Sequence, residues 1–292
     1  MHKSGETIVL KAGAYQAKIV TVGAGIAELT QCGKHLVLPH LPEEMPLAHL
    51  GKVLVPWPNR ITGGRYAFQG KSYLPAINDR VANAAIHGLL AWHNWTVSER
   101  SPSAVTLTAF LPPGYGYPFM LVSEVSYRLD GNTGLSARIS SQNIGEDTAP
   151  YGAGVHPYLT CNLQRVDECE LCLPEGHIFH VDALVYQDPH LAGLDFRHPT
   201  QINSTGIDHT FKPVPDDAPW EVKLTDTRHS MSTWLRSNAP WLQVYSGEKL
   251  NRLGLAVEPM SCPPDAFNST IDLISLAPGE THHLQYSIGG EK

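Results

Sequence analysis

Glu258 is the residue of this chain whose surroundings most suggest chemistry. It follows the apolar residues 253–257 and comes before Pro259, Pro263 and Pro264. The apolar run predicts a buried strand, which the prolines should end beside Glu258. A carboxyl group in such a place is partly desolvated, which raises its pKa and suits a general base. The alternative is a structural carboxylate that accepts hydrogen bonds from loop amides.

Two histidines stand in similar positions upstream. His87 follows the small and apolar residues 84–86, His156 follows residues 152–155, and each comes directly before a turn-forming residue. Both imidazoles should therefore lie where a buried strand meets a loop. An imidazole there can exchange a proton near neutral pH, although many such histidines only bond a carbonyl in the core.

Asn59 and Arg60 form a third candidate element. They follow a turn stiffened by Pro56 and Pro58. The amide and the guanidinium group together offer several donors for hydroxyl groups or for an oxyanion that develops during a reaction. Arg60 could equally be a structural ion-pair residue.

The order of these short motifs resembles the aldose 1-epimerases, or galactose mutarotases. The motifs are Asn59-Arg60, His87-Gly88, His156-Pro157-Tyr158, residues 207–211, residues 242–247, and Glu258 with residues 264–268. The stretches 19–29 and 63–73 also look like that family's opening strands and hairpin, so the resemblance covers nearly the whole chain. Pro157 and Tyr158 stand where typical galactose enzymes have a Ser- or Thr-containing stretch, which places this chain in an outlying branch.

The resemblance implies the large antiparallel β super-sandwich of the galactose mutarotase-like fold. The composition agrees, because 23 Pro and 25 Gly among 292 residues leave little room for long helices and 42% apolar residues suffice for a sizeable core. Alternating polarity predicts one all-β domain, and the resemblance implies that it is a single mutarotase-like domain over residues 1–292. The predicted strands are 7–11, 15–21, 34–38, 95–99, 105–110, 121–129, 135–143, 221–226, 231–236, 241–245 and 281–288.

The resemblance also implies the reaction, which interconverts the α and β anomers of an aldohexose or a derivative. A base removes the proton of the anomeric hydroxyl while an acid protonates the ring oxygen; the ring opens, and closure on the other face reverses both transfers. No cofactor is needed. We assign Glu258 as the base and His156 as the acid, in its imidazolium form at the start. The nearby carboxylate is expected to raise the pKa of His156.

Other residues are expected to hold the sugar. By resemblance, Arg60 and His87 bond sugar oxygens, and Asp208 accepts hydrogen bonds from ring hydroxyls. His209 could face the pocket instead of Asp208, because adjacent strand residues point to opposite sides. Asn59 is expected to assist. The candidates to pack on the apolar faces of the sugar are Tyr158, Trp57 and Phe267.

Composition narrows the partners further. The net charge of -7 argues against nucleic acid or an anionic membrane as a partner. No apolar run approaches the roughly 20 residues that span a bilayer, and the first residues lack the apolar stretch of a signal peptide. The odd number of Cys, 5, suits reduced thiols. We therefore expect a cytoplasmic monomer or homodimer whose partner is a small-molecule sugar.

Three alternatives stay open at this point. The chain could bind a sugar without turnover, since a fold does not fix a function. It could be a metalloenzyme with His87, His156 and Glu258 as a facial triad, although their spacing is not the usual one. It could also act on an anionic sugar, phosphorylated or sulfonated. The cations proposed to meet that charge are Arg65, Lys71 and Arg80, which lie near the candidate motifs in sequence.

Overall fold

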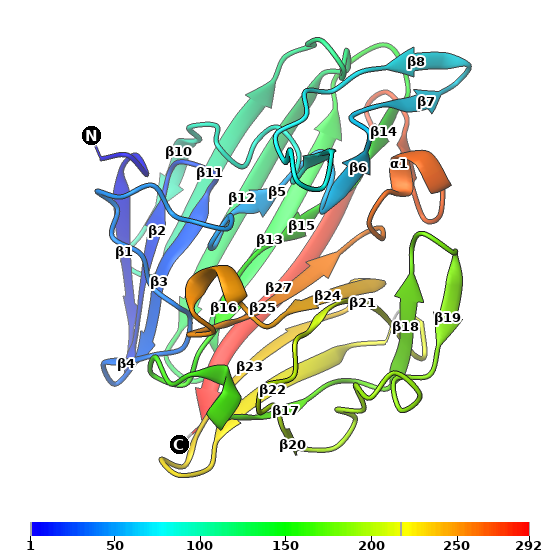
Figure 1. Cartoon of the computed structure of the whole chain (residues 1–292). Helices are drawn as coiled ribbons and strands as arrows, with labels where there is room; N and C mark the ends of the chain where they lie inside the picture. Colours follow the sequence, from blue (N-terminus) through cyan, green and yellow to red (C-terminus); the bar gives the residue numbers. More distant parts are fainter. Residues whose placement is uncertain (1, 217, 292) are drawn as a thin grey trace.

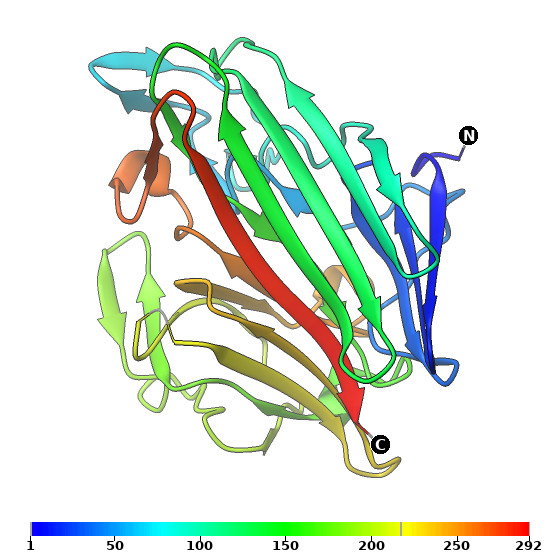
Figure 2. The ribbon, with the colours of Figure 1, turned by 180° about the vertical axis from the view of Figure 1, so that it is seen from behind.

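Long antiparallel strands form the largest sheet of the protein. A computed structural model describes residues 2–216 and 218–291. Figures 1 and 2 show this sheet as one continuous twisted layer. Its nine strands are, in order, β10 (Thr96–Arg100), β11 (Ala104–Leu111), β12 (Leu121–Asp130), β13 (Gly134–Asn143), β27 (Thr281–Glu291), β23 (Met231–Ser237), β22 (Trp220–Asp226), β17 (Glu170–Cys172) and β20 (Thr200–Gln201).

A second sheet of eight strands carries most of the candidate residues. Its strands are, in order, β19 (Val185–Gln187), β18 (Gly176–His180), β21 (Asp208–Pro213), β24 (Trp241–Tyr245), β25 (Leu255–Met260), β15 (Gly154–Val155) and β5 (Val53–Leu54), and β16 (Tyr158–Leu159) also pairs with β25. Every residue of β25 is buried. The strand is therefore covered on both faces, which explains its continuous apolar character.

Smaller elements complete the architecture. One four-stranded sheet contains β1 (Thr7–Ala12), β2 (Tyr15–Val20), β3 (Gly25–Gln31) and β4 (Lys34–His35). Three strand pairs are β6 (Arg60–Thr62) with β9 (Ala84–Ile86), β7 (Tyr66–Phe68) with β8 (Lys71–Tyr73), and β14 (Ala149–Tyr151) with β26 (Ile274–Leu276). The helical segments are α1 (Ala266–Ser269), η1 (Val166–Glu168) and η2 (Glu248–Leu250). Over the described ranges, no helix has the length and apolar character needed to cross a membrane.

Side chains of the two large sheets meet in one buried core. It contains Val125 of β12, Ile139 of β13, Leu235 of β23, Val244 of β24 and Val257 of β25. Burial of each such side chain contributes about 1.5–3 kcal/mol. The predicted antiparallel all-β sandwich is thereby confirmed.

The predicted strands are present, with two differences of note. The strand predicted at 34–38 ends at His35, and Val37 makes only a single bridge, to Leu159. Pro259 does not end the strand that carries Glu258, because β25 continues through it. Pro259 has no N–H group to donate to the ladder. The amides of Val257 and Ser261 donate to the carbonyls of Pro157 and Ala153 and hold the strand on either side of it.

Candidate active site

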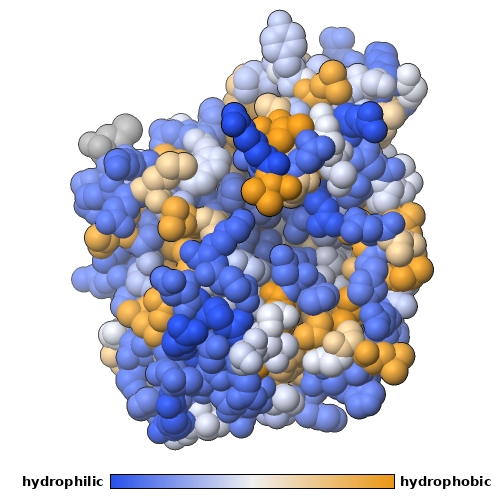
Figure 3. All heavy atoms as spheres, in the orientation of Figure 1, coloured by the Kyte–Doolittle hydropathy of each residue, from blue (hydrophilic) through white to orange (hydrophobic). Residues whose placement is uncertain are grey.

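A cavity of about 670 Å³ opens on the face of the molecule seen in Figure 3. Its walls come from β21, β24 and β25, from the ends of β6 and β9, from the β18–β19 hairpin and from residues 48–49. Hydrophilic side chains form much of its rim, with hydrophobic side chains between them. This volume lies in the range of roughly 300–1,000 Å³ that is typical of sites for small molecules.

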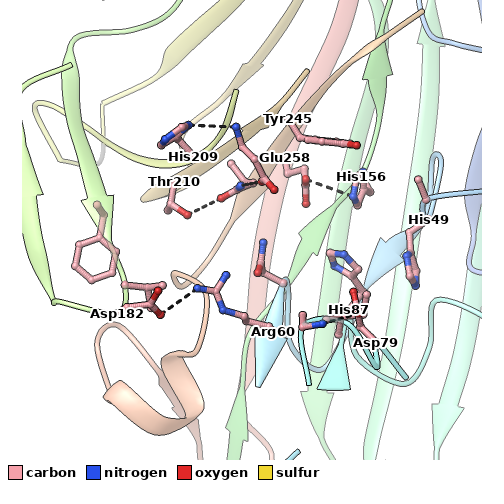
Figure 4. Close-up of a pocket in the computed structure, with 18 of the residues that line it drawn as sticks. His49, Arg60, Asp79, His87, His156, Asp182, His209, Thr210, Tyr245 and Glu258 are labelled. Atoms are coloured by element: carbon pink, nitrogen blue, oxygen red, sulfur yellow. Dashed lines mark hydrogen bonds and ion pairs between the residues drawn. The ribbon is translucent and has the colours of Figure 1, made fainter. Parts of the chain in front are cut away.

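Strand register brings Glu258 and His156 together. β15 and β16 pair with β25 in one common register, which puts His156 opposite Glu258. The two groups face one another in the cavity wall (Figure 4), with 3.4 Å between His156 Nε2 and Glu258 Oε1. Their side chains are only 7% and 3% exposed. The two residues assigned to proton transfer therefore form a direct, buried pair.

Burial moves both pKa values of this pair toward the uncharged forms. Desolvation raises the pKa of Glu258 well above its ordinary value, and Asp208 adds to this shift. Desolvation also lowers the pKa of His156, to about 3. The expectation that the carboxylate raises the histidine pKa is thus wrong, because loss of water around the imidazolium outweighs attraction by a carboxyl group that is itself desolvated.

Several polar atoms of the site have unused hydrogen-bonding capacity. Glu258 Oε2, His156 Nδ1 and His87 Nδ1 are buried and have no hydrogen-bond partner among the residues described. Buried polar atoms are nearly always bonded in folded proteins, and an unpaired one destabilises the fold. These three atoms are enclosed by the protein, so their missing hydrogen bonds are a cost to the stability of the site.

The pairing of β6 with β9 brings Arg60 and His87 into the same wall. Arg60 lies opposite Ile86, and the amide of His87 donates to the carbonyl of Asn59 at 2.8 Å. Asn59 and His87 both adopt left-handed backbone conformations, with φ of 52° and 63°. Arg60 reaches across the cavity, where its Nη2 lies 3.5 Å from Asp182 Oδ1 (Figure 4). The predicted residues Asn59, Arg60 and His87 therefore all line the cavity.

Asp208 and His209 both line the cavity, so the choice between them does not arise. Thr210 donates to Oε1 of Gln243, and Nε2 of Gln243 donates to Asp208 Oδ1 at 2.7 Å. Gln243 also lies opposite Glu258 in the β24–β25 ladder. Partial desolvation raises the pKa of Asp208. Gln243 thus holds the carboxyl group of Asp208 near that of Glu258.

Of the three aromatic residues predicted to pack on the sugar, only Tyr158 lines the cavity. Tyr158 lines the cavity and stacks on His156, with ring centroids 5.0 Å apart and planes at 15°. Trp57 and Phe267 are absent from the lining and pack against each other in the core, with centroids 5.6 Å apart. For these two, an interior packing role replaces the predicted contact with a sugar.

Several lining residues carry no clear signal in the sequence, and His49 and Lys249 are two of them. The ring of His49 lies 4.5 Å from that of His87, measured between centroids. Lys249 of η2 also lines the cavity. A weak signal marks His49, because Leu50 and Gly51 follow it much as Gly88 and Leu89 follow His87. No comparable pattern marks Lys249.

The cations predicted for an anionic substrate lie elsewhere. Arg65, Lys71 and Arg80 are not among the residues that line the cavity. Arg65 immediately precedes the β7–β8 hairpin and Lys71 begins its second strand. The cationic side chains that do line the cavity are Arg60 and Lys249.

The facial-triad alternative finds no support in the geometry. Over residues 2–216 and 218–291, no three His, Cys, Asp or Glu side chains are arranged to hold a metal ion. His87, His156 and Glu258 share the cavity without such an arrangement. The set of residues suits proton transfer and hydrogen bonding to hydroxyl groups.

Comparisons with known proteins agree with this geometry. The chain is 57% identical over 298 residues, which cover 100% of this chain and 96% of the relative, to an uncharacterized Escherichia coli (strain K12) protein, YihR. The fold matches a GalM/aldose epimerase homologue from C. elegans, with a TM-score of 0.86, 18% identity and 98% of each chain covered. It also matches galactose 1-epimerase from Lactobacillus acidophilus, with a TM-score of 0.83, 20% identity, and 98% of this chain and 94% of that chain covered. The sequence model described as aldose 1-epimerase matches residues 6–289, and the chain therefore belongs to the aldose 1-epimerase family.

Proposed function

We propose that the protein is an aldose 1-epimerase that interconverts the α and β anomers of an aldohexose or a derivative. The observation that carries this proposal is the buried pair of Glu258 and His156 in a cavity lined by groups that bond hydroxyls. A protein that only binds a sugar needs no desolvated proton donor and acceptor side by side. Ring opening needs both.

The proton balance of the pair fits the reaction. Glu258 as a carboxylate takes the proton of the anomeric hydroxyl, and His156 as an imidazolium delivers one to the ring oxygen. The open-chain stage then faces a neutral carboxylic acid and a neutral imidazole. Closure on the other face of the carbonyl returns both protons along the same routes.

Desolvation makes each group a stronger proton-transfer partner when the pair is in its ionised form. The neutral pair and the ion pair contain the same number of protons, so a transfer between the two groups interconverts them without solvent. Because burial raises the pKa of Glu258 and lowers that of His156, the carboxylate is a stronger base and the imidazolium a stronger acid than in water. Both transfers to and from the sugar therefore run toward the neutral groups that the buried site prefers.

The other lining residues have roles in binding. Arg60 and His87 are placed to bond sugar oxygens, and Asp208, held by Gln243, is placed to accept hydrogen bonds from ring hydroxyls. Tyr158 supports His156 by stacking on it. Asn59 fixes the backbone of His87 through its carbonyl group.

Exchange between anomers tests the proposal. Freshly dissolved single anomers of a panel of aldohexoses are followed by polarimetry or by NMR exchange spectroscopy, with the spontaneous rate subtracted. Glu258→Gln and His156→Asn should each lower the rate by at least about a hundredfold in a folded protein, because each removes one proton-transfer partner. Near-normal activity of either variant would sink the assignment. Sugar binding without exchange in the unmodified protein would identify a binding protein instead.

A second candidate substrate is an anionic hexose derivative. Lys249 lines the cavity and has no carboxylate within ion-pair distance among the described residues. Arg60 has one such partner, Asp182, whose side chain is 94% exposed and easily displaced. Asp79 and Asp208 line the same cavity, and their carboxylates would repel an anion. The anionic group of the sugar would therefore have to lie beside Arg60 and Lys249.

A further inference from the structure

His49 lines the cavity but has no part in the reaction described above. Main-chain bonds fix its segment to the wall that carries the acid: the amide of Lys52 donates to the carbonyl of His49, and the amide of His156 donates to the carbonyl of Lys52. The ring of His49 lies beside that of His87, and its centroid is 6.4 Å from that of His156 (Figure 4). It is thus a third imidazole in a fixed position.

One nitrogen of His49 already has a partner. Trp92 Nε1 lies 3.2 Å from His49 Nε2. An indole N–H can only donate, so Nε2 must offer a lone pair. Burial lowers the pKa of His49 to about 4, so the ring is neutral near pH 7 and carries a single proton. That proton must therefore sit on Nδ1.

The other nitrogen, Nδ1, is a donor without an acceptor. It makes no hydrogen bond within the described part of the chain, and it is not closed off as the Nδ1 atoms of His87 and His156 are. Trp92 is held in turn by Lys52, whose Nζ lies 5.1 Å from the centroid of the indole ring. The result is an N–H group of fixed direction in the wall of the cavity.

We propose that His49 is a further substrate-binding residue, which donates from Nδ1–H to a hydroxyl oxygen of the sugar, and that Trp92 is the positioning residue that selects this tautomer. This inference rests on the proposed epimerase function. Its consequence is specificity: a sugar without a hydroxyl at that position leaves the donor unpaired, and such a loss is poorly tolerated in a buried site.

Two amide substitutions distinguish this role from simple packing. In His49→Asn the side-chain amide nitrogen falls near the position of Nδ1, so the donor is kept and the partner of Trp92 is lost. In His49→Gln the amide falls near Nε2, so the partner of Trp92 is kept and the donor is lost. We expect a rise in KM of about two- to tenfold for His49→Gln and a smaller rise for His49→Asn. The reverse order would overturn the proposal, because it would mean that only the bond to Trp92 matters.

Trp92→Phe completes the design, since it keeps an aromatic ring beneath Lys52 and removes the N–H donor together with part of the indole ring. It should raise KM in the original background, where the Nε2–H tautomer becomes populated, and have no further effect in the His49→Asn background. An equal effect of Trp92→Phe in both backgrounds would contradict the role in tautomer selection.

A long-range ¹H–¹⁵N NMR spectrum of the unliganded protein tests the tautomer without any activity. We expect the Nδ1–H tautomer of His49 in the original protein and a mixture of the two neutral tautomers in Trp92→Phe. An Nε2–H tautomer in the original protein would refute the inference. Failure of the proposed function is a separate outcome, seen as absence of anomer exchange in the original protein. In that case the affinity for sugar, measured by NMR titration of the same variants, replaces KM and decides the role of His49.

Discussion

Glu258→Gln should stabilise the protein, and by more at neutral pH than in mild acid. The folded state raises the pKa of Glu258 by desolvation. At pH values below the ordinary carboxyl pKa, Glu258 is protonated in both the folded and the unfolded states, so it costs little stability. At higher pH, Glu258 ionises in the unfolded chain but stays protonated in the folded protein. The free energy of unfolding therefore falls as pH rises toward the pKa of Glu258 in the folded state. Glutamine does not ionise and avoids this loss.

The size of the effect is bounded by proton linkage. The difference in unfolding free energy between Glu258→Gln and the original protein should grow with pH by at most about 1.4 kcal/mol per pH unit, the limit for a single proton. His156 is present in both proteins, so to first order its contribution cancels in the difference between their unfolding free energies. The lost ion-pair partner costs little, because the 3.4 Å pair is uncharged in the buried site.

Urea unfolding at about pH 5 and about pH 7.5 measures this growth. Glu124→Gln on the exposed face of β12 is the matched control, and its stability difference should not depend on pH in this interval. A stability difference for Glu258→Gln that is equal at both pH values, or a variant that is less stable at neutral pH, would refute the reasoning. A Glu258→Gln variant that is more stable but inactive would show that the carboxyl group of Glu258 serves catalysis at the expense of stability.

Three further results are expected. The pH profile of kcat/KM should show no fall near pH 6.5, because burial lowers the pKa of His156 to about 3; an acid limb at the ordinary histidine value would contradict the buried pair. Lys249→Met should raise KM for an anionic hexose by about tenfold and leave the neutral parent within about twofold, whereas Lys71→Met outside the cavity should affect neither; equal effects of Lys249→Met on both sugars would exclude the anionic substrate. Exhaustive treatment with a chelator should leave anomer exchange intact, and activity that returns only on addition of metal would favour a metal-dependent site.

Much of the site follows from sequence because local features mark it. Glu258 and His156 each come directly after a buried apolar run, and polarity predicts the bounds of most of the eleven expected strands to within a residue or two. Short strands such as β14, β17 and β18 are not among the expected strands. The pairing of the strands follows less directly from the sequence. The position of His156 opposite Glu258 depends on the register of β15 and β16 against β25, which no local pattern encodes.

The errors share a physical cause, which is reliance on what lies nearby in sequence. Arg65 and Lys71 are close to Arg60 along the chain, but the β7–β8 hairpin takes them away from the cavity, while Lys249 comes from a distant turn. One neighbouring charge predicts a raised pKa for His156, whereas the burial that lowers this pKa results from the packing of many strands. Pro259 predicts a strand end, but the hydrogen bonds of the residues on either side of it hold the strand.

The place of β27 in the large sheet has a consequence for how the protein folds. β27 lies between β13 and β23, so the nine-stranded layer consists of two separate halves until β27 inserts. Because contacts of long sequence separation form late and slowly, the layer behind β24 and β25 closes only after residues 281–291 are available. Refolding from denaturant should therefore recover turnover in step with insertion of residues 281–291, after the hairpin of β12 and β13 has formed, and a nascent chain that still lacks this strand would be without activity however much β-structure it contains.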